Sequence, residues 1–346
     1  MEGERSENIE KMIDVMFNVY EKIFPDYKIN QILSECFKLQ LLRFKNRKEV
    51  TLNDTNYLAN SILKCVNNKA GKNFKLTGRP LLIISRELLR TSNDVKDNVV
   101  LAIADIKVRF PEFFEGIESR YGTLYSLRGP KINEMVNLYV DAIRKLVDSN
   151  PPDMICFPEL FCPPQGSLNP IIQLAKENKL FIVAGSDHNL TEHSNVGVII
   201  SPSGKIYTQE KFLKSEVEGI KQKSISYLKI FDTDIGQFTV PICLDIEHPK
   251  LKEILVMKKD ICEGVDFILN PSFHESPDRA NSMLITLAEN VYAVGVFANG
   301  HERGGSFIFD LSQNFFNSNS HDLVKSIDVK GMRNIRYSKQ NCKVNP

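Results

Sequence analysis

Long apolar runs and a paired-cysteine pattern are both missing from this 346-residue sequence. No apolar run reaches the roughly 18 residues that a membrane-spanning helix needs, so no membrane span is predicted. Residues 1–15 are charged, unlike the apolar core of a secretion signal. The cysteines are odd in number and scattered, which argues against a disulfide framework and favours a reducing, cytoplasmic compartment; they stand at positions 36, 65, 156, 162, 243, 262 and 342.

Signatures of metal binding and nucleic-acid binding are missing as well. Cys156 and Cys162 stand six residues apart, and no compact ligand pair matches a zinc site. His188 and His193 lie among Asn, Ser, Thr and Asp, which favours loop positions over metal ligation. The densest basic run, at residues 43–48, belongs to no recognisable nucleic-acid motif, and the formal net charge is only +1. We therefore predict no metal, no cofactor and no nucleic-acid partner.

Three segments with strand character each carry an ionisable residue at the end of the strand. They are residues 153–161, 204–212 and 238–245. Each predicts a strand, and the strands lead to Glu159, Lys211 and Cys243 respectively. The spacings of 52 and 32 residues leave room for a strand–helix unit between them, and α/β proteins gather reactive groups at the carboxyl ends of strands. We predict that the three residues share one site.

These residue types suit acyl transfer. A thiol has a reference pKa near 8.5, so a nucleophilic Cys243 needs a base at neutral pH, and Glu159 is the candidate. The tetrahedral intermediate carries negative charge on an oxygen, which the Lys211 ammonium and the backbone N–H of Leu244 are predicted to stabilise. The alternative for an isolated apolar cysteine is an inert core position, which the other two segments argue against.

The ordered set of motifs resembles the nitrilase superfamily, the carbon–nitrogen hydrolases. The family's Phe-Pro-Glu strand end is matched at Phe157–Glu159, its lysine after a Tyr-containing strand at Lys211, and its Ile-Cys-x-Asp segment at Ile242–Asp245. Later segments continue the match in the family's order, at residues 264–272, 288–290, 298–306 and 326–336. The resemblance covers about residues 98–340 and implies an α/β fold, a nitrilase-like α-β-β-α sandwich with helices outside two facing sheets.

Two assignments within this pattern remain open. The resemblance implies a second glutamate after the lysine, and Glu218 fits best, with Glu216 as the alternative. Lys214 competes with Lys211 because residues 209–215 align in two ways, and we prefer Lys211 because it directly follows the strand. The segment 107–130 is longer and more charged than the family requires, so the sequence predicts the reaction class better than the substrate.

Residues 1–95 are predicted to form a separate helical region, which the hydrolase family does not require. Apolar residues recur at helical spacing over residues 7–24 and, less cleanly, over 32–44 and 57–66. A polar linker at residues 90–97 precedes the hydrolase domain of residues 98–340. We expect the N-terminal helices to bind a partner protein or to serve assembly.

The resemblance implies hydrolysis of a non-peptide carbon–nitrogen bond, in a linear amide or an N-carbamoyl compound, through a cysteine thioester and without cofactor or metal. It also implies a homodimer or larger homo-oligomer. The competing function is a nitrilase-like effector or interaction module, which acts by partner or ligand binding with little turnover. The presence of Glu159, Lys211 and Cys243 together favours the enzyme.

Overall fold

The computed structural model describes residues 81–90 and 95–341, apart from residues 105, 107, 217, 224, 262–263 and 312–322. The helices predicted within residues 1–66 lie outside the described residues. The same is true of Cys36, Cys65, Cys262 and Cys342, so the structure places three of the seven cysteines.

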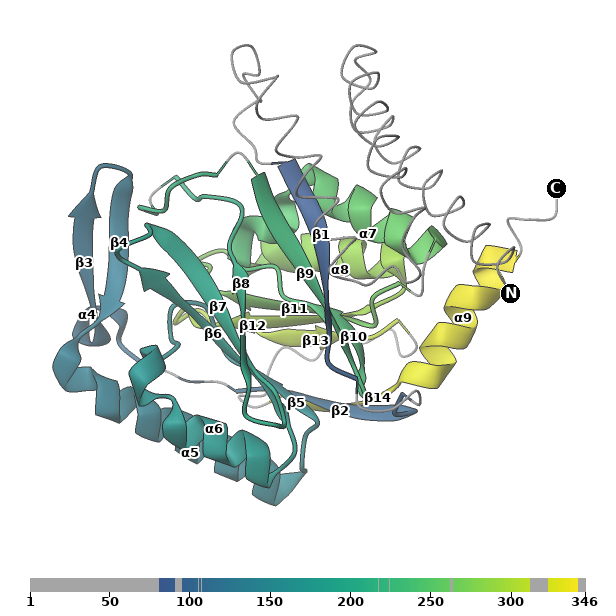
Figure 1. Cartoon of the computed structure of the whole chain (residues 1–346), viewed down its shortest axis with the longest axis horizontal. Coiled ribbons are helices and arrows are strands. Elements are labelled where there is room, and N and C mark those ends of the chain that lie inside the picture. The colour runs from purple at the N-terminus through teal and green to yellow at the C-terminus, as the bar shows by residue number, and fades with distance from the viewer. Residues whose placement is uncertain are drawn as a thin grey trace, which may run out of the picture. The chain divides into compact units, whose positions relative to one another are not determined.

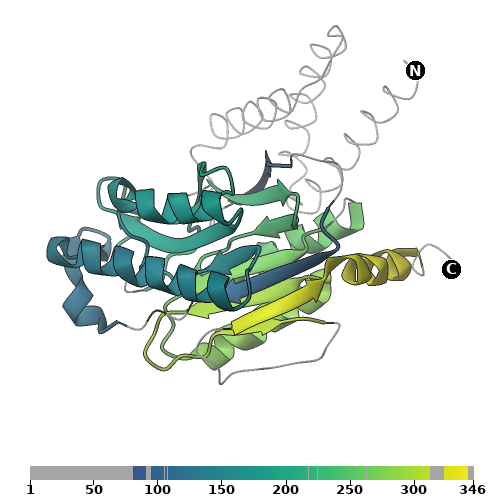
Figure 2. The same cartoon turned by 90° about the horizontal axis from the view of Figure 1, so that it is seen from below.

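Two six-stranded sheets pack face to face (Figures 1 and 2). The first has, in spatial order, β14 (Leu323–Asp328), β2 (Asn98–Ile103), β5 (Met154–Cys156), β6 (Phe181–Asn189), β7 (Ser194–Ile200) and β8 (Ile206–Glu210). The second has β1 (Leu81–Leu88), β9 (Ile225–Thr233), β10 (Gly236–Thr239), β11 (Phe267–Ser272), β12 (Val294–Asn299) and β13 (Phe307–Phe309).

Helices cover the outer face of each sheet, which completes the α-β-β-α sandwich and confirms the predicted fold class (Figure 1). The first sheet carries α5 (Ile132–Ser149) and α6 (Asn169–Glu177), and the second carries α7 (Pro249–Ile261) and α8 (Pro277–Val291). A last helix, α9 (Val329–Asn341), follows β14. Short helical turns occur at η1 (Gly129–Lys131), η2 (Gln165–Ser167) and η3 (Cys243–Glu247).

The alternating direction of side chains along each strand explains how the layers pack. In β2, Leu101 and Ile103 point into the apolar cluster between the two sheets. Ala102 between them belongs to the cluster that includes Met135 and Tyr139 of α5. Successive side chains of a strand face opposite sides, so a strand buried on both faces reads as a nearly continuous apolar run. This is why β2 and β5 were recognisable from the sequence.

Strand direction places three carboxyl ends near one another. β2, β5 and β6 are mutually parallel, and β7 and β8 follow as antiparallel neighbours, so β8 runs in the direction of β5. In the second sheet β10 is parallel to β11 and β12. The residues after β5, β8 and β10 are those that the sequence singled out as a site.

The segment 108–130 is a structured insertion, where the sequence had suggested a charged loop. It contains α4 (Phe110–Phe113) and an antiparallel hairpin of β3 (Phe114–Ser119) and β4 (Gly122–Leu127). Phe113, Leu124 and Leu127 are buried, whereas most of β3 is exposed. The exposed charged residues of β3 concealed the strand in the sequence.

The prediction of a helical region up to residue 95 is wrong for residues 81–88. These residues form β1, an edge strand that runs parallel to β9 in full register from Leu81 to Leu88. Leu82 is buried, and Arg86 and Arg90 form ion pairs with the buried Asp232 of β9. The second sheet therefore begins before the polar stretch that was predicted to be the linker.

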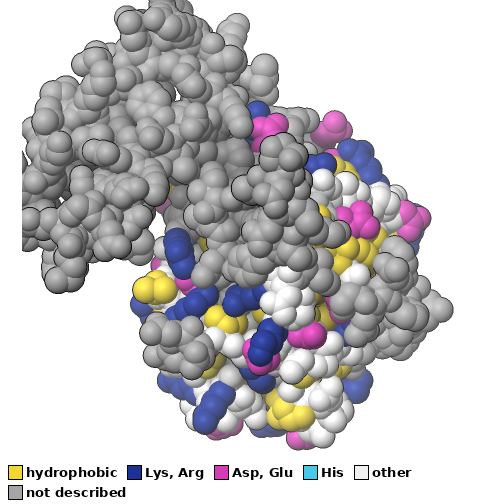
Figure 3. Space-filling model, turned by 90° about the vertical axis from the view of Figure 1, so that its right-hand side faces the viewer, with side chains coloured by type: hydrophobic (Ala, Val, Ile, Leu, Met, Phe, Trp, Pro, Cys, Tyr) yellow, Lys and Arg dark blue, Asp and Glu magenta, His cyan; other side chains and the backbone are white. Residues whose placement is uncertain are grey.

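The surface of the described residues is mixed in character. On the face in Figure 3, hydrophobic side chains lie in small groups among Lys, Arg, Asp and Glu. The large hydrophobic side chains exposed in the part that the structure describes are Ile84, Leu88, Ile117, Leu190 and Tyr227. Among the helices so described, none is both long enough and apolar enough to cross a membrane.

Candidate active site

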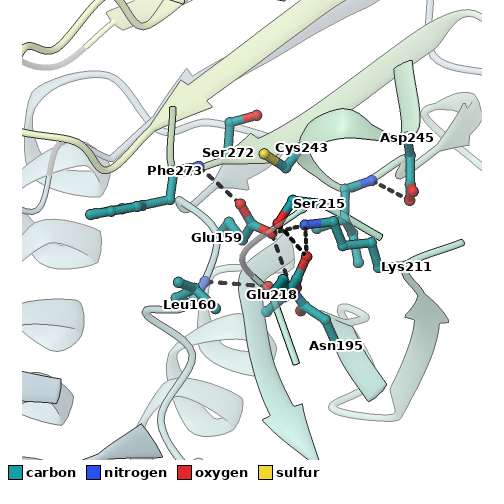
Figure 4. A network of polar contacts seen from close by, with 12 residues as sticks. Glu159, Leu160, Asn195, Lys211, Ser215, Glu218, Cys243, Asp245, Ser272 and Phe273 are labelled. Carbon is teal, nitrogen blue, oxygen red and sulfur yellow. Dashed lines mark hydrogen bonds and ion pairs between the residues drawn. The ribbon is translucent and has the colours of Figure 1, made fainter. Parts of the chain in front are cut away.

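The structure brings Glu159, Lys211 and Cys243 together (Figure 4). Glu159 lies three residues after β5, Lys211 directly follows β8, and Cys243 lies four residues after β10. The first two come from one sheet and the third from the other. All three side chains are buried, so the thiol, the carboxylate and the ammonium meet in a desolvated place between the sheets.

Lys211 lies between two carboxylates. Its Nζ is 2.7 Å from Glu159 Oε1 and 2.7 Å from Glu218 Oε2. Burial alone would lower the pKa of Lys211, but the charges of Glu159 and Glu218 raise it well above its ordinary value. Glu218 is 5% exposed, whereas Glu216 is exposed, so the structure brings Glu218 and not Glu216 to this cluster.

Lys214, the rival lysine, points elsewhere. It is half-buried, and its Nζ donates a hydrogen bond to the backbone carbonyl of Tyr121 in the turn of the β3–β4 hairpin. The lysine between the carboxylates is therefore Lys211. Leu244, whose N–H was predicted to stabilise an oxyanion, is half-buried and follows Cys243 within η3. Its N–H belongs to the first turn of a helix, where amides lack an acceptor within the helix.

Asn195 is a member of this cluster that the sequence did not reveal. It lies in β7, is fully buried, and its Nδ2 donates to Glu159 Oε1 at 2.9 Å and to Glu218 Oε1 at 2.8 Å. Its backbone carbonyl also accepts the N–H of Lys211 at 2.8 Å. One asparagine thus joins both carboxylates and the lysine. The only sequence signal was a polar residue inside an apolar strand.

His188 is a second missed member, and its assignment to a loop is wrong. It lies in β6, is 4% exposed, and its Nε2 is 2.9 Å from Glu218 Oε1. Ser186, Asp187 and Asn189, the polar neighbours that favoured a loop, lie in the same strand. His193, by contrast, lies in the turn between β6 and β7 and has a positive φ of 50°.

Glu159 is held by the backbone on both sides of it. Its Oε2 accepts the N–H of Phe273, the residue after β11, at 3.0 Å. The next residue, Leu160, has a positive φ of 68° and donates its N–H to Ser186 Oγ at 3.2 Å. Gly185 makes room for this turn, because a Cβ there would lie 1.9 Å from the carbonyl oxygen of Pro158. The carboxylate therefore has little freedom to move.

Cys243 occupies a sharp turn after β10, as the first residue of η3. Its φ is +49°, a left-handed value that costs a non-glycine residue of order 1–3 kcal/mol and that clusters at functional sites. Asn270 of β11 stabilises the turn, since its Nδ2 donates to the carbonyls of Pro241 at 2.8 Å and of Cys243 at 3.1 Å. Ser272 in turn donates to Asn270 Oδ1 at 2.8 Å.

Asp245 connects this turn to the lysine segment. One of its oxygens accepts the N–H groups of Phe212 and Leu213, at 3.0 and 2.7 Å, and the other accepts the N–H of Ile242 at 2.9 Å. Burial raises the pKa of Asp245 well above its ordinary value, while Lys211 and the three N–H groups oppose that rise. The aspartate of the Ile-Cys-x-Asp motif is thus a structural brace.

The thiol of Cys243 is protonated at neutral pH. Burial raises its pKa well above the ordinary value, the negative charge of Glu159 raises it further, and Lys211 lowers it. Burial also raises the pKa values of Cys156 and Cys162, and neither has a lysine that opposes the effect. Among the cysteines that the structure describes, only Cys243 combines a nearby base with a nearby ammonium.

The described ranges contain no group of three or more His, Cys, Asp and Glu side chains arranged to hold a metal ion. The polar groups around Cys243 are instead a proton acceptor, a cation and hydrogen-bond donors. Such a set is able to move a proton to and from the thiol and to stabilise a negative charge beside it.

No protein-family model matches the sequence, and no curated protein matches it. Solved structures do match. Nit3 of Saccharomyces cerevisiae, a member of branch 10 of the nitrilase superfamily, superposes with a TM-score of 0.54 at 17% identity, over 71% of this chain and 96% of that one. XC1258 of Xanthomonas campestris, a CN-hydrolase superfamily protein, gives 0.52 at 12% identity, over 70% and 94% of the two chains.

An amidase from Nesterenkonia sp. superposes with a TM-score of 0.51 at 12% identity, over 73% of this chain and 99% of that one. These matches span nearly the whole length of the three solved proteins. Sequence identities this low support a similarity of fold alone. The chain has the fold of the nitrilase superfamily, as its motifs predicted.

Proposed function

We propose that this protein is a carbon–nitrogen hydrolase that uses Cys243 as its nucleophile. The observation that carries the proposal is the buried Lys211 ammonium, 2.7 Å from Glu159 and 2.7 Å from Glu218, beside a cysteine on a left-handed turn. Burying three charges is costly, and a structural core gains as much from apolar residues of similar volume. A buried cluster of this composition, next to a thiol, fits chemistry better than stability.

Attack begins from the neutral thiol. Glu159 accepts the proton of Cys243 as the sulfur attacks the carbonyl carbon of the substrate, since burial raises the pKa of Cys243 and leaves little thiolate at rest. The carbonyl π electrons move to oxygen. Lys211 and the N–H of Leu244 stabilise the resulting oxyanion, and the loss of one such donor costs other enzymes about 3–4 kcal/mol.

The tetrahedral intermediate then breaks down. Glu159 returns its proton to the leaving nitrogen, the oxyanion reforms the carbonyl, and the carbon–nitrogen bond breaks. Ammonia departs from a primary amide, or an amine from a substituted one. The acyl group stays on Cys243 as a thioester, and Glu159 is again a carboxylate.

Hydrolysis of the thioester completes the cycle by the same groups. Water attacks the thioester carbonyl while Glu159 accepts one of its protons, and Lys211 again faces the oxyanion. Collapse expels the Cys243 thiolate, which takes the proton from Glu159. A carboxylic acid is released, and the site returns to its starting protonation.

Glu218 supports this cycle without taking part in the bond changes. Burial would raise the pKa of Glu218, but Lys211 and His188 outweigh burial and lower it below the ordinary range. The carboxylate is therefore ionised at every working pH. A permanent anion on one side of Lys211 keeps the ammonium charged while Glu159, on the other side, gains and loses a proton.

The proposed substrates are linear amides and N-carbamoyl compounds. We would measure the release of ammonia from a panel of primary amides, ureido acids and nitriles, with Cys243→Ala as the inactive control. Turnover of any panel member that disappears in Cys243→Ala supports the hydrolase. Two results together would favour the alternative of a binding module with little turnover. No panel member would be turned over, and no electrophilic amide analogue would label Cys243.

A further inference from the structure

We propose that His188 is a positioning residue for this site, which holds Glu218 against Lys211 and ties it to the β3–β4 hairpin. The inference rests on the proposed hydrolase function, because Glu218 matters through the lysine that faces the oxyanion. It concerns a residue that the sequence motifs do not include and that takes no part in the bond changes above. Three sets of contacts support it.

The hydrogen bonds of the imidazole determine which ring nitrogen carries the proton. Nδ1 of His188 is 2.7 Å from the backbone nitrogen of Tyr125, a β4 residue, and 3.2 Å from the carbonyl oxygen of the same residue. The shorter contact makes Nδ1 the acceptor of the Tyr125 N–H. In the neutral ring the proton is then on Nε2, which is 2.9 Å from Glu218 Oε1 and donates to it. Both side chains are buried, so neither hydrogen bond competes with bulk water. The ring is thus fixed from both sides.

Each oxygen of Glu218 has a defined pair of donors. Oε1 accepts from Asn195 at 2.8 Å and from His188 at 2.9 Å. Oε2 accepts from Lys211 at 2.7 Å and from Ser215 at 3.4 Å. Without His188, Oε1 retains only an amide that also bonds Glu159, and a buried carboxylate with an unfilled acceptor is costly. Rotation toward another donor would pull Glu218 away from Lys211.

The balance of charge makes this donor important. One ammonium, Lys211, serves two carboxylates, so the cluster carries a net negative charge while His188 is neutral. The groups that face the imidazole are Glu218 from the segment after β8 and the stacked ring of Tyr125 from β4. Asp187 is its neighbour on β6, with a pKa that burial raises to about 6.

The hairpin supports the same carboxylate through its backbone. Thr123 of β4 forms a parallel bridge with Glu218, and its carbonyl accepts the N–H of Gly219 at 2.7 Å. The strand that holds the backbone of residue 218 therefore also fixes His188, which holds the side chain of that residue. The β3–β4 hairpin thus positions the side chain of Glu218 through His188.

The test uses two substitutions and a matched control. His188→Ala removes the donor, whereas His188→Gln places an amide nitrogen near the position of Nε2 and keeps it. His193→Asn is the control, because His193 is half-buried with a φ of 50°, which asparagine tolerates, and its ring contacts Tyr121 outside the cluster. We expect kcat to fall by at least about tenfold in His188→Ala with KM changed by less than about threefold, and His188→Gln to recover most of the loss. His193→Asn should match the parent protein.

A second measurement does not depend on turnover. The rate at which iodoacetamide alkylates Cys243 is followed against pH in each variant. Lys211 lowers the pKa of Cys243, so displacement of the ammonium from the thiol together with Glu218 should slow alkylation at neutral pH and move its midpoint upward in His188→Ala. His188→Gln should restore the profile. If no amide is hydrolysed but this shift occurs, the proposed function fails and the role of His188 stands.

Three results would overturn the role of His188. One is an unchanged kcat and an unchanged alkylation profile in His188→Ala. Another is an equal loss in His188→Ala and His188→Gln, which would mean that the ring fills space and that its donor is unimportant. The third is a loss in His193→Asn as large as that in His188→Ala. Circular dichroism and thermal melting of all variants accompany the assays, and His188→Gln decides the question if His188→Ala does not fold.

Discussion

The carboxylate of Asp245 accepts the backbone N–H of Phe212 at 3.0 Å, although the two residues lie 33 positions apart and follow strands of different sheets. Phe212 follows Lys211, and Asp245 lies two positions after Cys243. The distance between the ammonium and the thiol is therefore set by a short path of covalent bonds and one hydrogen bond. A second N–H, that of Leu213, strengthens the connection at 2.7 Å.

We predict that Asp245→Ala lowers both stability and activity. Three buried N–H groups would lose their acceptor, which we expect to reduce the free energy of unfolding by roughly 2–4 kcal/mol. Cys243 and Lys211 would also lose their fixed separation, so turnover should fall by at least about tenfold. Denaturant titration and an ammonia-release assay measure the two effects. Asp141→Ala on the exposed side of α5 is the control, and an equal loss there would refute the brace.

Substitution of the two lysines should distinguish their roles. Lys211→Met leaves Glu159 and Glu218 buried without their cation, so we expect a loss of about 3–5 kcal/mol in unfolding free energy and of at least about a hundredfold in turnover. Lys214→Met removes one half-buried hydrogen bond to Tyr121 and should leave turnover within a few-fold. Turnover that survives the first change but not the second would show that Lys214 is the catalytic lysine.

Cys243 should react with iodoacetamide faster than Cys156 and Cys162. It is 7% exposed, against 0% and 1% for the other two, and it alone has Lys211 to stabilise a thiolate. Because its pKa is raised, its alkylation should be slow near neutral pH and still be rising above the reference value of about 8.5. Peptide mass spectrometry after brief labelling measures each rate. Faster labelling of either neighbour would contradict the assignment.

Asp187 gives the fold a pH dependence of predictable sign. Burial raises its pKa to about 6, and the backbone N–H of His188 opposes the rise. The unfolded value is near 3.9, so the folded protein binds this proton more tightly, and the stabilisation is full below about pH 4 and lost as pH rises through about 6. Asp187→Asn should therefore gain roughly 1–3 kcal/mol over the parent protein at about pH 8, and less at about pH 5.

Urea unfolding of Asp187→Asn and of the parent protein at several pH values checks this sign. Asp148→Asn, at an exposed position of α5, serves as the comparison and should show no such trend. A gain that grows toward acid instead of alkali would mean that Asp187 is stabilised as an anion in the folded protein.

The sequence revealed the parts of the site that sit at the ends of apolar strands. Glu159 and Cys243 follow β5 and β10, which are buried along their whole length, and buried strands stand out in a sequence. β8, which precedes Lys211, is mostly half-buried, and its place in the order of motifs identified it instead. The order of motifs then predicted the two-sheet sandwich. Burial separated Glu218 from Glu216, which sequence alone could not do, because both are acids on one short segment.

The residues that the sequence missed owe their place to partners far away in the chain. Asn195 lies inside a strand where a polar side chain reads as a loop signal, and its two acceptors are 36 and 23 positions away. His188 is held by Tyr125, which is 63 positions earlier. The local pattern of apolar and polar residues does not show which distant residues pair. These site residues can therefore be identified only from the assembled strands.

Removal of the chain before Asp94 would take away β1, a strand of the second sheet. β1 pairs with β9 over its full length, and Asp232 of β9 is buried against Arg86 and Arg90. A fragment that began at the polar stretch would leave β9 with an open hydrogen-bonding edge and a buried acid without its cations, which favours aggregation. Anyone who produces the sandwich alone should therefore cut upstream of Leu81.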